Sequence, residues 1–89
     1  MSKYQKLLLK ILRGNSDTNI GFLEFRILLI KFGFAERVKG SHHIFSKAGI
    51  EEIINIQEKS GKAKPYQVKQ VRQLILKYKL NLENDEGQP

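Results

Sequence analysis

A chain of 89 residues is expected to form one small domain, and a domain of this size buries only about 60% of its unfolded surface, which argues against a deep enclosed pocket. The absence of cysteine excludes disulfides and thiolate metal sites. The formal charge of +7 comes from 16 Lys and Arg against 9 Asp and Glu, so we expect a polyanionic partner. RNA, DNA, an anionic membrane and an acidic protein all satisfy this charge.

The N-terminal segment, residues 3–13, is predicted to be an amphipathic helix. Its apolar positions follow helical spacing, and Gly14 stands where a helix stop is expected. Lysines at 3, 6 and 10 interrupt every apolar run, so we expect neither a signal peptide nor a membrane span there. A soluble cytoplasmic protein without a membrane partner is the resulting expectation.

A second helix is predicted over residues 20–32. Its apolar stripe is typical of ordinary core, and Gly33 is a suitable stop. The stripe consists of Phe22, Phe25, Leu28, Leu29 and Phe32.

The hydrophobic period changes after Gly33 from helical spacing to alternation. Three strands are predicted over residues 34–39, 42–47 and 51–57, and their short connections require an antiparallel sheet. Residues 59–64 are expected to be a flexible basic loop, and Pro65 is suited to start a last helix that continues to about residue 79. The prediction is one α+β domain over residues 1–80, with helices covering the apolar side of the sheet and an additional N-terminal helix over 1–14. The acidic residues 81–89 are expected to be a disordered tail.

Both histidines of the chain, His42 and His43, follow the turn Gly40-Ser41. Imidazole has an unperturbed pKa of about 6.5 and exchanges protons near neutral pH. Adjacent side chains on a strand point to opposite faces, so only one of the two histidines can address a given phosphate. The same divergence argues against a zinc site, and we expect no metal and no small-molecule cofactor.

The element order, the helix end Lys31-Phe32-Gly33-Phe34, and the motif Gly40-Ser41-His42-His43-Ile44-Phe45 resemble the HicA family over roughly residues 20–80. The resemblance implies a double-stranded-RNA-binding-domain-like fold. It also implies ribosome-independent cleavage of mRNA by the toxin of a toxin–antitoxin pair, and neutralisation by a HicB antitoxin. By the same resemblance His42 is the catalytic residue, and His43 occupies a more variable position. The chain departs from many members in lacking a later histidine within residues 57–67.

Metal-independent RNA cleavage needs a base for the ribose 2′-hydroxyl and an acid for the leaving oxygen. We expect His42 to transfer protons and Ser41 or nearby backbone amides to hold the phosphate, with Gly40, Lys39 and His43 as supporting neighbours. Positive charge from Arg37, Lys39 and Lys64 would stabilise the transition state. The second proton-transfer group is not identified by the sequence.

The segment 61–79 contains six bases and no acid, which predicts a basic surface for a phosphate backbone. Tyr66 is expected to stack on a base or ribose. The predicted RNA-binding residues are Arg37, Lys62, Lys64, Tyr66, Lys69 and Arg72.

Several alternatives stay open at this point. The basic faces are equally typical of ordinary solvated helices, and the histidines of strand residues with no chemistry. A non-catalytic RNA-binding module, or an inactivated toxin that binds only its antitoxin, also agrees with the sequence.

Overall fold

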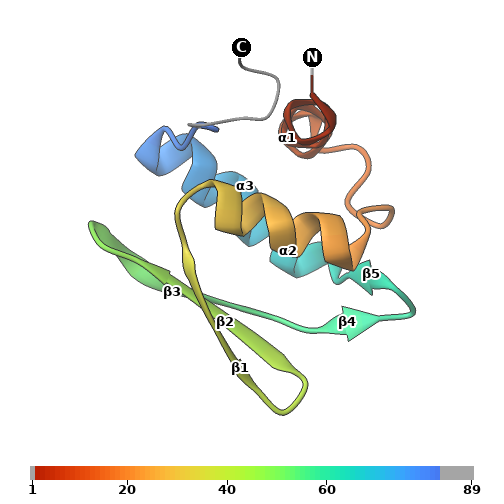
Figure 1. Ribbon diagram of the computed structural model, residues 1–89. Coiled ribbons are helices and arrows are strands. Elements are labelled where there is room, and N and C mark those ends of the chain that lie inside the picture. The colour runs from red at the N-terminus through yellow and green to blue at the C-terminus, as the bar shows by residue number, and fades with distance from the viewer. Residues whose placement is uncertain (1, 83–89) are drawn as a thin grey trace.

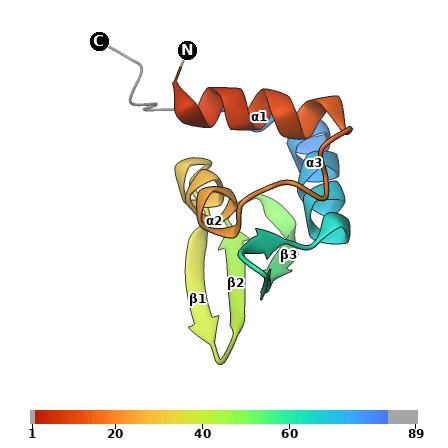
Figure 2. The same ribbon diagram turned by 90° about the vertical axis from the view of Figure 1, so that its right-hand side faces the viewer.

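The computed structural model describes residues 2–82 as an α+β domain in three layers (Figures 1 and 2). The three helices are α1 (Lys3–Arg13), α2 (Phe22–Lys31) and α3 (Pro65–Tyr78). The strands are β1 (Ala35–Lys39), β2 (His42–Lys47), β3 (Ile50–Ile56), β4 (Glu58–Lys59) and β5 (Lys62–Ala63). Strands β1, β2 and β3 form an antiparallel sheet in that order, which confirms the predicted α+β class and strand orientation.

Helices α2 and α3 lie side by side on one face of the sheet, and α1 crosses them on the side away from the sheet (Figures 1 and 2). The predicted stripe of α2 is buried in full. The inward side of α3 is also buried at Val68, Val71, Leu74 and Ile75, and Tyr78 is half-buried. They pack on Phe45, Ile54 and Ile56 of the sheet to make one core. Among residues 2–82, no helix has the length and apolar character needed to cross a membrane.

The local sequence explains where the first and last helices start. The Ser2 hydroxyl accepts a hydrogen bond from the Gln5 backbone amide at 3.1 Å, and the Gln5 side-chain oxygen accepts one from the Ser2 amide at 3.4 Å. These bonds satisfy amides that the first helical turn leaves unpaired. Gly14 ends α1 with a φ of 76°, a conformation that glycine adopts without steric cost. Pro65 occupies the first position of α3, as predicted.

Helix α2 begins two residues later than the predicted residue 20. The Ile20 carbonyl accepts from the Ala63 amide at 2.9 Å, and the Phe22 amide donates to the Gly61 carbonyl at 3.0 Å. Residues 20–21 are therefore held in an extended conformation beside β5, and the helix starts only after this pairing ends.

The predicted flexible loop over residues 59–64 is incorrect, because the segment includes the β4–β5 hairpin. Its turn residues Ser60 and Gly61 have φ values of 54° and 79°. Two consecutive left-handed residues make the tight turn that matches the twist of paired strands. The structure also moves the start of β3 to Ile50. Most of the predicted acidic tail, residues 83–89, lies outside the described residues.

The β1–β2 hairpin extends beyond the helices that cover the rest of the sheet (Figure 2). The alternation of β1 therefore has different consequences along its length. Burial on the inner face of β1 decreases toward the turn. Phe34, just before β1, is buried, Glu36 is half-buried, and Val38, near the turn, is 56% exposed. The turn residues that precede the histidines consequently lie at a projecting end of the molecule.

Candidate functional site

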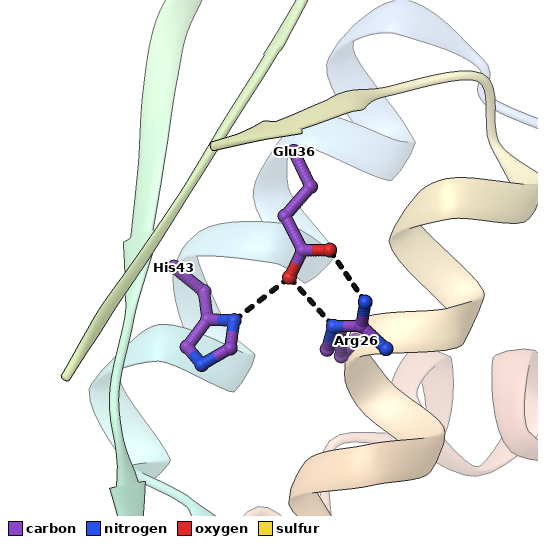
Figure 3. Close-up of polar contacts among 3 residues, drawn as sticks. All are labelled: Arg26, Glu36 and His43. Atoms are coloured by element: carbon purple, nitrogen blue, oxygen red, sulfur yellow. Dashed lines mark hydrogen bonds and ion pairs between the residues drawn. The ribbon is translucent and has the colours of Figure 1, made fainter. Parts of the chain in front are cut away.

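The two histidines point to opposite faces of the sheet, as strand geometry predicted. His42 Nδ1 lies 2.9 Å from Asn55 Oδ1 on the outer face, the face opposite α2. His43 Nδ1 lies 2.7 Å from Glu36 Oε2 on the face toward α2 (Figure 3). The two imidazoles therefore have different partners and cannot address one phosphate together.

The inner cluster, defined as Arg26, Glu36 and His43, joins α2 to β1 and β2 (Figure 3). Arg26 donates from Nε and Nη2 to the two carboxylate oxygens of Glu36, both at 2.6 Å. The pKa of Glu36 is lowered, first by the Arg26 hydrogen bond and further by His43, while burial opposes the shift. The same contact raises the pKa of Arg26.

His43 is enclosed within this inner cluster. Its ring packs edge-on against Phe22 with centroids 5.0 Å apart, and its side chain is 22% exposed. Since Glu36 occupies Nδ1 and Phe22 covers the ring, His43 is well placed to fix the hairpin against α2. These contacts suit a structural role, in agreement with the more variable position that His43 occupies in the motif.

His42 is exposed and lines a cavity of about 320 Å³ between the outer face of the sheet and the first turns of α3. A neutral His42 imidazole that donates from Nδ1 to the Asn55 amide oxygen keeps a lone pair on Nε2. An imidazole held in this tautomer can accept a proton from a bound group. The complete lining consists of His42, Ile53, Asn55, Gln57, Tyr66, Gln67 and Gln70.

Ser41 belongs to a hydrogen-bonded chain beside this cavity. Lys64 Nζ donates to Gln57 Oε1 at 3.3 Å, and Gln57 Nε2 donates to Ser41 Oγ at 3.0 Å. The preceding Gly40 has a φ of 61° and no atom within 4 Å of the position that a Cβ would occupy. Backbone conformation, not lack of space, therefore favours glycine at the turn.

Two predicted cations share the outer face with His42. Lys39 is the cross-strand partner of His42, and Arg37 is the partner of Ile44, so the pleat directs their side chains to the same side. Both residues are exposed. The structure thus brings His42, Lys39 and Arg37 to one face, with Lys64 connected through Gln57.

Acidic side chains from other parts of the fold contact the basic segment 61–79. Arg72 makes two hydrogen bonds to Asp17, at 2.8 and 3.0 Å, and a third to the Ile11 carbonyl. Lys77 pairs with Glu52 at 2.8 Å. The acids come from elements distant in sequence, so the expectation of a one-signed surface was wrong at these two positions.

The remaining predicted RNA-binding residues of the segment lie nearer the start of α3. Lys62 donates to Asn19 Oδ1 at 3.0 Å, and Lys69 is exposed. Tyr66 is 65% exposed and lines the same cavity as His42. Arg72 differs from them, because Asp17 holds its guanidinium and raises its pKa.

Sequence reasoning missed the amide residues of the cavity. Asn55, Gln57, Gln67 and Gln70 come from a strand, its end and a helix, and no local motif joins them. The available signal was the strand alternation, which puts Asn55 and Gln57 on one face of the third strand and predicts that they share it with His42.

Within residues 2–82, no group of three or more His, Cys, Asp or Glu side chains is arranged to hold a metal ion. Comparison of the chain with protein-family models, curated proteins and solved structures finds no match. Membership of the HicA family therefore remains a proposal that rests on the residues quoted above.

Proposed function

We propose that this protein is a metal-independent endoribonuclease in which His42 transfers the proton. The observation that supports the proposal best is the exposed His42 imidazole, oriented by Asn55 at 2.9 Å on the rim of an open cavity. Its free Nε2 is suited to take the proton from a ribose 2′-hydroxyl. An open site on a small domain also suits a polymer substrate better than a small molecule.

The charges around His42 support a phosphate as the reacting group. Lys39 and Arg37 lie on the same face, and Lys64 is linked to Ser41 through Gln57. Such cations stabilise the negative charge that develops on a phosphate oxygen in the transition state. Tyr66 in the same cavity is a candidate for the second proton-transfer group, because its phenol can donate a hydrogen bond to the leaving oxygen.

Within this proposal the chain is a HicA-like toxin with a double-stranded-RNA-binding-domain-like fold. Its substrate is mRNA in the cytoplasm, and a HicB-like antitoxin neutralises it. The observed α+β layout is compatible with that fold, and the resemblance over residues 20–80 supplies the rest.

The test is incubation of purified protein with a radiolabelled RNA in the presence of a chelator. We expect cleavage by the wild type and a loss of at least about 100-fold in His42→Ala, the lower limit of a general base contribution. His43→Gln serves as the neighbouring control and should reduce cleavage far less than His42→Ala, because His43 contacts Glu36 and does not line the cavity. Unchanged cleavage in a folded His42→Ala protein, checked by circular dichroism, contradicts the proposal.

A second candidate is an RNA-binding module that does not cleave. One observation favours it: His42 is the only residue lining the cavity whose unperturbed pKa lies near neutrality. Binding of RNA by the wild type without any product, under the same conditions, supports this candidate.

A further inference from the structure

The cavity beside His42 combines neutral polar groups with apolar surface. Four of its seven lining residues have amide side chains, and none has a charged one apart from the titratable His42. Its volume of about 320 Å³ lies at the lower end of the roughly 300–1,000 Å³ typical of small-ligand sites. The lining therefore suits a flat, neutral, hydrogen-bonding group.

Part of this hydrogen-bonding capacity is unused. The Gln70 side chain has no hydrogen bond within residues 2–82, and neither does the Asn55 amide nitrogen, since only Asn55 Oδ1 contacts His42. By contrast, Gln57 is bonded to Ser41 and Lys64, and the buried Gln67 accepts from the Lys64 amide at 3.2 Å. Gln70 can therefore turn its donor and acceptor to a ligand, and Asn55 its amide nitrogen, without breaking an existing contact.

Apolar surface lies next to these amides. Ile53 is 55% exposed and Tyr66 is 65% exposed, although both are large hydrophobic side chains. Aromatic and aliphatic surfaces of this kind stack on the faces of unpaired bases, while side-chain amides read base edges. The cations Lys39 and Lys64 lie beside the cavity but do not line it. A phosphate backbone could pass along these cations while its base enters the cavity.

We infer that this cavity binds one unpaired nucleobase of single-stranded RNA next to the phosphate that His42 addresses. Gln70 and Asn55 bind the base edge, and Tyr66 and Ile53 contact its face. The inference rests on the proposed function and deepens it, because it makes the protein select its cleavage position by base identity. Double-stranded RNA is excluded from this site, since a paired base does not expose its face.

Binding is tested separately from cleavage with 2′-O-methyl oligonucleotides, in which the attacking hydroxyl is blocked. Fluorescence anisotropy is measured for labelled decamers of A, C and U, and for the A·U duplex. We expect the wild type to prefer one decamer by at least about fivefold, the lower end of what one amide contact to a base contributes, and to bind the duplex more weakly.

Gln70→Met retains the length of the side chain and removes its hydrogen bonds. It should bring the decamer affinities to within about twofold of one another. Gln73→Met, an exposed position on the same helix outside the cavity, is the matched control and should keep the preference. Equal binding of all decamers by the wild type, or a preference that survives Gln70→Met, overturns the inference.

The two proposals fail in different ways. Cleavage of RNA without a base preference contradicts only the nucleobase site. A base preference in binding without cleavage contradicts only the ribonuclease activity and leaves the nucleobase site standing.

Discussion

Replacement of Glu36 by glutamine tests the inner cluster. The carboxylate is 12% exposed and receives two hydrogen bonds of 2.6 Å from Arg26 and one contact of 2.7 Å from His43. Glutamine keeps the shape of the side chain, removes its charge and leaves the Arg26 guanidinium half-buried beside a neutral amide. The cost is therefore electrostatic and does not come from a cavity in the core.

The magnitude follows from the kind of contact that is lost. A hydrogen bond to a charged group contributes roughly 1.5–3 kcal/mol, and a fully buried ion pair that loses one partner costs about 3–5 kcal/mol. Arg26 is 31% exposed, so solvent recovers part of the loss, and we expect about 2 kcal/mol at pH 7. For a domain of this size that free energy lowers Tm by about 8–16 °C.

The pH dependence has a definite sign. The folded-state pKa of Glu36 lies below its ordinary value of 4.5. Its contribution to stability is therefore fully present above that value and is lost as the pH falls through the lower folded-state pKa. The free energy of unfolding, measured in urea, should therefore differ between wild type and Glu36→Gln at pH 7, and the two values should converge as the pH falls below 4.5 and through the lowered pKa. Glu51→Gln, an exposed position on β3, is the control and should change stability by less than about 0.5 kcal/mol. A cost below that limit for Glu36→Gln, or one that is constant with pH, would refute the assignment.

Three further predictions concern α3 and the segment that precedes it. Asp17→Asn should lower the free energy of unfolding, measured in urea, by about 1–2 kcal/mol, because Arg72 loses a charged partner. Replacing Lys62, Lys64 and Lys69 together with glutamine should cost less stability, but it should weaken RNA binding for all sequences and lower the salt dependence of that binding. Unchanged RNA binding would exclude these lysines from the interface. Glu52 accepts hydrogen bonds from Lys77 and Tyr78, which lower its pKa to about 2. Its carboxyl resonance should therefore titrate near that value by NMR, and the titration midpoint should rise in Lys77→Met. A midpoint that does not respond to this replacement contradicts the contact.

The parts of the fold that local patterns determine were predicted well. The stripe of α2 is buried because apolar residues at helical spacing form one face that packs against the core as a unit. The antiparallel arrangement of β1, β2 and β3 follows from connections that are too short for a crossover. The separation of His42 from His43 followed from the strand pleat alone. These inferences need no knowledge of distant residues.

The errors concern contacts between distant segments. The late start of α2 depends on hydrogen bonds between residues 20–22 and 61–63, and Asp17 lies 55 positions before Arg72. A count of charges along residues 61–79 cannot include an acid that folding brings from elsewhere. The Ser60-Gly61 turn, in contrast, was a local hairpin signal that the basic composition obscured.

The inner cluster and the cavity beside His42 are connected through the same β1–β2 hairpin. Glu36 and His43 alternate along β1 and β2 with Arg37 and His42, so the contacts that fix one face also fix the other. The hairpin projects beyond the helices, and Arg26 of α2 is the side chain that binds it through Glu36 (Figure 3). We therefore expect the stability of the Arg26–Glu36 contact to determine how much of the time His42 keeps its hydrogen bond to Asn55. Under the proposed function, the two adjacent histidines would then serve one site in different ways: His43 would position the strand from the inner face, and His42 would contact the substrate from the outer face.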